Sequence, residues 1–463
     1  MSMAKIDKST IKDFNSTRIS KKFLCNAPFC AMRFSISGLV SPCCHSFGLN
    51  DCYPNRNIRQ IWDGSIFKEY RITIRNGQLP NSCTYCESRL KSKEFSLIPI
   101  RQFDDFKVRR IGRNNLQTLQ LAISNRCNLK CPMCNEMFSS QYDQSDTFDS
   151  NNIYDEAFIN ELYEYIPHLN ELICLGGEPF LINEYYDIWD KIISVNPSCR
   201  ISVVTNGTVL NDRIKRLLEL GNFSINLSFE TIVKETYEKI RVNANYDTVI
   251  PNMEYFAKVL RQQGKTLQIP ACALKSNSKE IPDLVRFCNE KEYHLTILTT
   301  YRDIDVAMWS LSSDQLKELK DYYIQQTFTT HDWNSNDNVS NFKNFISTVD
   351  RWISDAEKKE NFQNIFDLKT DKVTDLKNRL FSNMEKCLKE TSLSEDDFGK
   401  KREYVFGKWK RIMDSLPEYF ESNHLYKILL QVSPYIIVEY MLRCNSQTMK
   451  KTLEEGFYYG FAH

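Results

Sequence analysis

The stretch Cys127-Asn-Leu-Lys-Cys131-Pro-Met-Cys134 decides how the rest of the chain is interpreted. It follows an apolar run at residues 118–124 that has the composition of a buried strand. Three thiolates on one loop can bind three irons of a cubane cluster and leave the fourth iron open to a small molecule. The alternatives are a zinc knuckle, which usually offers four ligands in two pairs, and three unrelated cysteines.

From residue 116 onward, short apolar strands alternate with amphipathic helices, which is typical of βα units that build a parallel sheet. The pattern predicts strands at residues 118–124, 171–175, 200–205, 223–228, 266–274 and 294–299. It predicts helices at residues 184–195, 212–220, 246–261 and 281–291. We therefore expect an α/β fold with a partial (β/α)6 TIM-like barrel, whose chemistry lies at the carboxyl ends of the strands.

The rest of the chain divides around this barrel, which we expect at residues 111–300. Residues 1–24 are predicted to form a polar arm, and residues 25–110 a small cysteine-rich module with a linker. Within the module, strand-like runs at residues 32–36 and 39–41 flank a turn at Gly38. Helical periodicity, for example at residues 314–326 and 396–416, predicts a mainly helical domain over residues 301–463.

The spacing Cys127-x-x-x-Cys131-x-x-Cys134 after a strand resembles the signature of the radical S-adenosylmethionine (radical SAM) superfamily. The resemblance implies that Cys127, Cys131 and Cys134 hold a catalytic 4Fe-4S cluster and that S-adenosyl-L-methionine binds at its open iron. Many members carry an aromatic residue before the third cysteine, near the adenine. Here that residue is Met133, whose thioether can still pack on a ring.

The segment Gly176-Gly177-Glu178-Pro179 after the second strand resembles the family's glycine-rich motif. The resemblance implies that backbone groups and Glu178 lie beside the methionine amino group, with the glycines permitting a close approach. A simple turn is the alternative interpretation.

Further polar residues follow the third and fourth strands, where family members place side chains near the ribose: Thr205, Asn206, Ser228 and Glu230. Arg241 resembles an arginine that some members use to bind the methionine carboxylate, a role suited to its planar fork. A surface arginine on a helix is the alternative for Arg241.

A second set of four cysteines, Cys25, Cys43, Cys83 and Cys86, offers enough soft ligands for a tetrahedral zinc or for a fully ligated 4Fe-4S cluster. The surrounding sequence resembles the twitch or SPASM-like modules that hold an auxiliary 4Fe-4S cluster, in a subgroup with this module at the amino terminus. Cys44 could replace Cys43. Cys30, Cys44 and Cys52 are spare cysteines of this module. The isolated cysteines, which we expect to be core residues rather than ligands, are Cys174, Cys199, Cys272, Cys288, Cys387 and Cys444.

The resemblance implies reductive cleavage of S-adenosyl-L-methionine to a 5'-deoxyadenosyl radical, which removes a hydrogen atom from a substrate. With an auxiliary cluster accepting the substrate electron, the expected outcome is oxidative modification of a peptide or small metabolite. An external electron donor such as flavodoxin or ferredoxin is implied. The alternatives are sulfur insertion from the auxiliary cluster, an epimerase in which Cys272 returns a hydrogen, and a binding protein that keeps the fold without the chemistry.

The composition restricts the partners of the chain. Sixty basic and fifty-nine acidic residues give a net charge of +1, which argues against nucleic acid as the substrate, although residues 107–110 form a local basic stretch. No apolar run approaches the roughly 20 residues of a membrane span, and the first residues lack an apolar signal core. We therefore expect a cytoplasmic protein that does not bind membranes.

Overall fold

The computed structural model describes residues 7–18, 23–46, 51–80, 82–91, 93, 95, 98–106, 108, 115–135, 137–142, 153–300, 305–362, 373–392, 394–415, 426, 429, 437, 438, 441 and 442. Cys444 and all of the basic stretch 107–110 except Val108 lie outside the described residues. Among the helices that are described, none has the length and apolar character that crossing a membrane requires.

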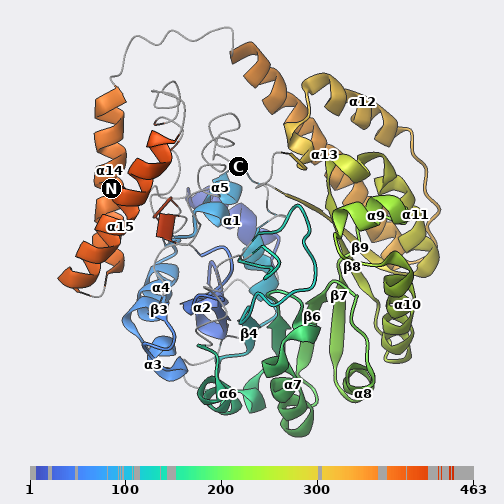
Figure 1. The fold of residues 1–463 in the computed structure, drawn as a ribbon, viewed down its shortest axis with the longest axis horizontal. Helices are drawn as coiled ribbons and strands as arrows, with labels where there is room; N and C mark the ends of the chain where they lie inside the picture. Colours follow the sequence, from blue (N-terminus) through green and yellow to red (C-terminus); the bar gives the residue numbers. More distant parts are fainter. Residues whose placement is uncertain are drawn as a thin grey trace.

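A nine-stranded sheet runs through the molecule, and all but one of its described strands run in the same direction (Figure 1). Its spatial order is β3-β2-β1-β4-β5-β6-β7-β8-β9. The strands are β1 (Ala31–Phe34), β2 (Leu39–Ser41), β3 (Asp51–Cys52), β4 (Thr118–Leu121), β5 (Glu171–Cys174), β6 (Arg200–Thr205), β7 (Phe223–Leu227), β8 (Gln268–Ala273) and β9 (His294–Thr299). The six strands predicted from Thr118 onward are confirmed as β4 to β9.

The sheet is larger than the six strands expected, because the amino-terminal module contributes three strands of its own. β1 pairs in parallel with β4, with Arg33 opposite Gln120 and Phe34 opposite Leu121. β2 and β3 continue the sheet as antiparallel strands, and the predicted turn between β1 and β2 contains Gly38, at φ +80°. The module and the βα region therefore share one hydrogen-bonded sheet.

One face of the sheet packs against helices. The helices of the βα region are α6 (Glu156–Tyr163), α7 (Asn183–Val195), α8 (Asp212–Leu220), α9 (Lys234–Ile240), α10 (Tyr246–Gln262) and α11 (Ile281–Lys291). Asparagine side chains cap two of the predicted ones: Asn211 accepts the N–H of Ile214 at the start of α8, and Asn245 accepts that of Thr248 in α10. All four predicted helices are confirmed.

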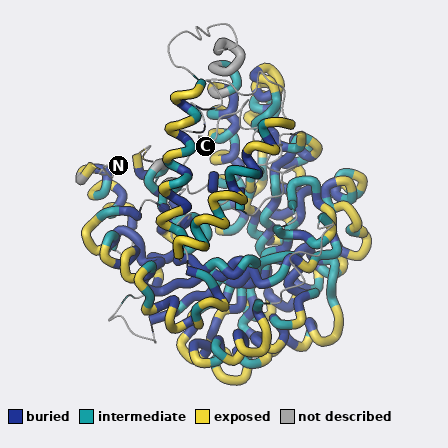
Figure 2. Tube along the Cα trace, turned by 60° about the vertical axis from the view of Figure 1, so that its left-hand side comes forward, coloured by how far each residue is buried: buried dark blue, intermediate teal, exposed yellow. Residues whose placement is uncertain are grey.

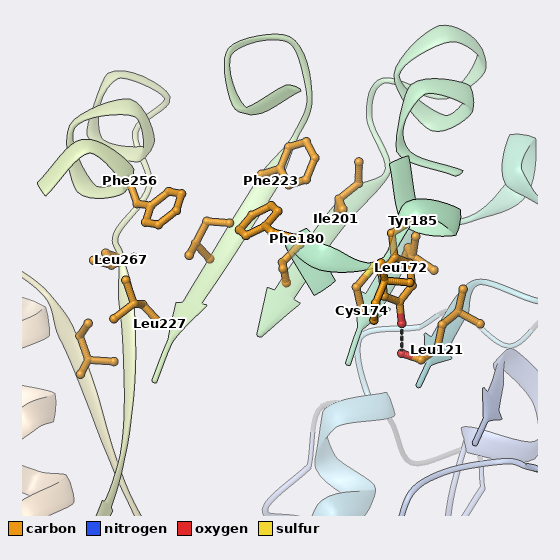
Figure 3. Close-up of a cluster of buried hydrophobic side chains, with 14 of the residues drawn as sticks. Leu121, Leu172, Cys174, Phe180, Tyr185, Ile201, Phe223, Leu227, Phe256 and Leu267 are labelled. Atoms are coloured by element: carbon orange, nitrogen blue, oxygen red, sulfur yellow. Dashed lines mark hydrogen bonds between the residues drawn. The ribbon is translucent and has the colours of Figure 1, made fainter. Parts of the chain in front are cut away.

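The core between the sheet and these helices is apolar and includes Cys174 and Cys288, as expected (Figure 3). The hydroxyl of Tyr185 on α7 lies 2.7 Å from the carbonyl oxygens of Leu121 and Leu175, where strands β4 and β5 end. Figure 2 shows buried residues concentrated along the sheet, with the exposed residues on the outer helices.

The opposite side of the sheet, which we call the polar face, carries side chains that are partly exposed. In one row across β1, β4, β5, β6 and β7 these are Arg33, Gln120, Ile173, Ser202 and Ser224, all polar except Ile173. Because side chains alternate between faces along a strand, the buried Leu119, Leu121 and Ile201 lie on the helix-packed side. This row therefore offers mainly hydrogen-bonding groups, whereas the helix-packed side is mainly apolar.

The edge strand β9 is protected by a long carboxy-terminal helix. The helices after the sheet are α12 (Ser313–Ile324), α13 (Trp333–Phe362), α14 (Val373–Thr391) and α15 (Glu395–Asp414). On α13, the Asn338 side chain accepts the N–H of Leu295, and Asn341 donates to the Leu295 carbonyl oxygen. Apolar residues of α13 join the core of the sheet, whereas α14 and α15 pack in a separate apolar cluster with Cys387.

The amino-terminal module has a third apolar cluster, which contains Cys25, Cys30 and Cys86. Its helices are α1 (Lys8–Ser16), α2 (Ala27–Cys30), α3 (Ile58–Trp62), α4 (Ser65–Arg75) and α5 (Thr84–Lys91). The segment expected as a polar arm thus contains a helix, and Phe14 of α1 is fully buried in this cluster.

Candidate active site

The three-cysteine loop begins six residues after β4 and is close to the carboxyl ends of the neighbouring strands. Cys131 is buried, and Cys127 and Cys134 are partly exposed. Burial and the nearby Cys131 and Cys127 raise the pKa of Cys134 to about 12. The three thiols are thus within electrostatic range of one another, as ligands of one cluster must be.

Hydrogen-bond donors point at two of these sulfur atoms. The backbone N–H of Leu129 donates to Sγ of Cys127 at 3.4 Å, and Nδ2 of Asn206 lies 3.9 Å from the same sulfur. Nη1 of Arg241 lies 3.8 Å from Sγ of Cys131. Donors and a positive charge stabilise thiolates, so the surroundings of the loop fit cysteines that bind iron.

The Gly-Gly-Glu segment after β5 holds the start of the cysteine loop. The N–H of Gly177 donates to the carbonyl oxygen of Ser124 at 2.9 Å, and that of Glu178 donates to the carbonyl oxygen of Arg126 at 2.8 Å. A Cβ atom on Gly177 would lie 2.1 Å from the Arg126 oxygen, and one on Gly176 would lie 2.4 Å from the Ser124 oxygen. The glycines therefore allow close approach between two loops of the chain itself.

Glu178 links this segment to the next strand end. Its fully buried carboxylate accepts bonds from Thr205 Oγ1 at 2.8 Å, from the Asn206 N–H at 2.7 Å and from the Phe180 N–H at 3.1 Å. Burial raises the pKa of Glu178 to about 7, although these donors oppose the shift. The structure thus brings together three residues predicted from the sequence, at the carboxyl ends of β5 and β6.

Glu230 and Arg241 form a buried ion pair after β7. Nε of Arg241 donates to Oε2 of Glu230 at 2.7 Å, and Nη2 bonds Oε1 of the same carboxylate. The side chain of Arg241 is 12% exposed, so the surface interpretation of this arginine is wrong. Asn277, which the sequence analysis did not single out, donates from its amide to the carbonyl oxygens of Glu230 and Cys272.

Ser228, Met133 and Cys272 are the other residues that the sequence analysis named at the barrel strands and the cysteine loop. Ser228 and Met133 are partly exposed, and the N–H of Ser228 donates to the Thr205 carbonyl oxygen at 2.9 Å. Cys272 on β8 is partly exposed; burial and Glu230 raise its pKa to about 12, and Arg241 opposes them. Cys272 is therefore within electrostatic range of the ion pair and lies outside the apolar core.

The four cysteines of the amino-terminal module also come together. Burial, followed by Cys83, Cys44, Cys25 and Cys86, raises the pKa of Cys43. Cys43 is thus electrostatically coupled to each of the other three predicted ligands. Among the described residues, no group of three or more His, Cys, Asp or Glu side chains is arranged to hold a single metal ion.

The spare cysteines of the module differ in their surroundings. Sγ of Cys30 donates to the carbonyl oxygen of Asn26 at 3.2 Å and is fully buried. Burial also raises the pKa of Cys44, but the positive charge of Arg33 opposes that shift. Arg33 is thus among the charges that shift the pKa of Cys44, whereas the neighbouring cysteines are those that shift the pKa of Cys43.

Comparison with known proteins finds a family that is similar to part of this chain. Residues 121–288 match the model of the Radical SAM superfamily, and this range includes the cysteine loop, the Gly-Gly-Glu segment and the Glu230–Arg241 pair. This match covers a little over a third of the chain. The part of the chain that is similar to radical SAM enzymes is thus the part that contains the cysteine loop.

Curated relatives are similar to less than half of the chain. A probable GTP 3',8-cyclase of Methanocaldococcus jannaschii is 27% identical over 221 residues, which cover 46% of this chain and 64% of the relative. Molybdenum cofactor biosynthesis protein 1 of Dictyostelium discoideum is 23% identical over 218 residues, or 46% of this chain and 33% of the relative. The chain thus spans between one third and two thirds of the length of these relatives.

Solved structures resemble it at low overall similarity. Native anSMEcpe with bound AdoMet matches with a TM-score of 0.34 and 18% identity, over 45% of this chain and 60% of that protein. Streptococcus suis SuiB bound to the precursor peptide SuiA matches with a TM-score of 0.35 and 15% identity, over 56% of this chain and 64% of SuiB.

Proposed function

We propose that this protein modifies a peptide or small metabolite oxidatively, by removing a hydrogen atom from a substrate that lies on the polar face of the sheet. The observation that carries the proposal is the set of donors around Cys127 and Cys131, which fits thiolate ligands of a cluster at the carboxyl ends of β4 to β7. When bound, the reduced cluster and S-adenosyl-L-methionine supply a 5'-deoxyadenosyl radical. We interpret the parallel part of the sheet as the partial (β/α)6 barrel of this chemistry.

Some residues of the chain hold the cysteine loop in place, and others orient donors toward its sulfur atoms. Gly177 and Glu178 fasten the cysteine loop through backbone hydrogen bonds, and Asn206 and Arg241 donate toward the sulfur atoms. We assign Met133, Ser228 and Glu230 to the surroundings of the cofactor. These groups are fixed before a ligand binds, so little reorganisation is needed at the reactive carbon.

We assign an auxiliary 4Fe-4S cluster to Cys25, Cys43, Cys83 and Cys86, in a twitch or SPASM-like module spanning residues 25–110. The mutual electrostatic coupling of these thiols supports the assignment. An auxiliary cluster would accept the electron left on the substrate after hydrogen removal. An external donor such as flavodoxin or ferredoxin would reduce the catalytic cluster in the cytoplasm.

The test is anaerobic reconstitution with iron and sulfide, followed by an assay for 5'-deoxyadenosine with dithionite. We expect about eight irons per chain in the wild type and about four in a Cys127/Cys131/Cys134→Ala variant, with the nucleoside formed only by the wild type. A Cys25/Cys43/Cys83/Cys86→Ala variant should also hold about four irons but still form the nucleoside. Cys288→Ala, at an isolated core cysteine, is the matched control and should keep the full iron content.

Two results would contradict parts of this proposal separately. Four irons and one zinc in the wild type would remove the auxiliary cluster, and with it the electron-accepting role. Absence of 5'-deoxyadenosine from a protein with a full iron content would remove the radical chemistry. GTP belongs in the first substrate screen because the curated relatives include GTP 3',8-cyclases.

A further inference from the structure

Arg33 places a positive charge on the polar face of the sheet. Its neighbours in register are Ser41 on β2 and Gln120 on β4, and the row continues through the apolar Ile173 on β5 to Ser202 and Ser224. Its direct cross-strand neighbours are neutral, so no carboxylate at these positions balances the guanidinium. This part of the face therefore combines one cation with neutral hydrogen-bonding groups.

Arg33 is also unpartnered among the residues that the structure describes. Its Nε atom is buried, yet it makes no hydrogen bond, and the guanidinium forms no ion pair there. The side chain of Arg33 is partly exposed, whereas two more deeply buried arginines are paired, Arg18 with Asp104 and Arg241 with Glu230. A buried N–H group without an acceptor is costly, so an anion that accepts a hydrogen bond from Nε of Arg33 would remove this cost.

The position of Arg33 is between the two sets of cysteines in the order of the sheet. β2, on one side of β1, leads directly into Cys43 and Cys44, and β4, on the other side, leads to Cys127. Because β2 is antiparallel to β1 and β4 is parallel to it, the chain leaves β2 and β4 at opposite ends of these strands. An anion held by Arg33 on β1 would therefore lie between the two loops.

We propose that Arg33 binds a carboxylate or phosphate group of the substrate and so places the substrate on the polar face between the two cysteine loops. The inference deepens the proposed function and rests on it for the identity of the bound molecule as substrate. The planar guanidinium can donate two parallel hydrogen bonds to either group. Ser41 and Gln120 provide neutral neighbours that do not repel an anion.

Binding can be measured without turnover, which separates this inference from the proposed chemistry. Reconstituted protein without reductant is titrated calorimetrically with phenyl phosphate, benzoate and the neutral analogue benzamide. We expect at least one anion to bind the wild type and to bind Arg33→Gln about tenfold more weakly or worse, with Arg33→Lys in between. Arg59→Gln, at an exposed arginine of the same module, is the control and should bind like the wild type.

Comparing the two anions shows which anionic group of the substrate Arg33 binds. Binding of phenyl phosphate alone supports a phosphorylated substrate, and binding of benzoate alone supports a carboxylate. Equal binding by wild type and Arg33→Gln, or no anion binding by the wild type, would overturn the inference. Iron content and circular dichroism verify folding, and if Arg33→Gln does not fold, the comparison rests on Arg33→Lys, which keeps the charge and loses the fork.

Two further assays, of cofactor binding and of 5'-deoxyadenosine formation, test whether Arg33 acts on the substrate. The affinity for S-adenosyl-L-methionine should be the same in Arg33→Gln and wild type, because Arg241 is the arginine assigned to that cofactor. Loss of cofactor affinity in Arg33→Gln would overturn the substrate role. Formation of 5'-deoxyadenosine tests only the proposed function. If the nucleoside is absent but anion binding still depends on Arg33, the proposed function is contradicted and the anion site is supported.

Discussion

Arg241 and Glu230 meet in a two-point ion pair directly beside Cys131. Burial opposes the charge on Arg241, but Glu230 and Cys131 together keep its pKa above the ordinary value. Arg241→Ala would leave the fully buried Glu230 carboxylate unpaired. We expect a loss of about 3–5 kcal/mol in the free energy of unfolding, measured by urea denaturation of the reconstituted protein. Arg241→Lys should lose less, and a loss below about 1 kcal/mol for Arg241→Ala would contradict the pairing.

Glu178 should make stability depend on pH. Its folded-state pKa of about 7 lies above the ordinary value of 4.5, so the folded protein binds more protons than the unfolded chain between these values. Stability therefore falls as pH rises through this window, by about 2 kcal/mol between pH 5.5 and 8 without S-adenosyl-L-methionine. Urea unfolding at several pH values should show this slope in the wild type and a flatter curve in Glu178→Gln. Glu318→Gln, at an exposed glutamate, should keep the wild-type slope.

Gly177 tests the contact between the two site loops. A Cβ there would overlap the Arg126 carbonyl oxygen, so Gly177→Ala must move the backbone just before Cys127. We expect an iron content lower by about four per chain, together with a loss of more than about 1 kcal/mol in stability. Gly399→Ala on α15 is the control, since nothing lies within 4 Å of an added Cβ there. That helical substitution should leave iron unchanged and raise stability slightly.

Asn206 should tune the catalytic cluster through its contact with the Cys127 sulfur. Donors to a thiolate favour the reduced, more negative state of a cluster. Removing one donor of about 1 kcal/mol in Asn206→Ala should lower the reduction potential by about 40 mV. A redox titration followed by electron paramagnetic resonance measures this shift. Asn222→Ala, at the opposite end of the strands, should not change the potential, and a shift of equal size there would rule out the contact as its cause.

The sequence was informative where a pattern is local. Alternating apolar residues predicted β6 and β9 with their observed bounds, and amphipathic spacing did the same for α8 and α11. The Gly-Gly-Glu segment could also be located from its position after a strand. Its partners could not, because hydrogen bonds from Thr205 and Asn206 to Glu178 depend on which strands become neighbours.

Nonlocal pairing explains what the sequence analysis missed. β1 is short and far along the chain from β4, and nothing in its residues indicates a parallel partner. The row that contains Arg33 and Gln120 exists only once that pairing is known. The ligand assignments stay predictions, which the reconstitution experiments address. The domain boundaries also stay predictions.

The parallel pairing of β1 with β4 has a mechanical consequence. Domains joined by a linker alone can change their separation, and an electron passing between them must wait for a favourable arrangement. Here four residue pairs fasten the amino-terminal module to the strand that precedes Cys127. The distance between the two cysteine sets is therefore fixed by one continuous sheet. A rigid-body rotation of one domain relative to the other cannot change it.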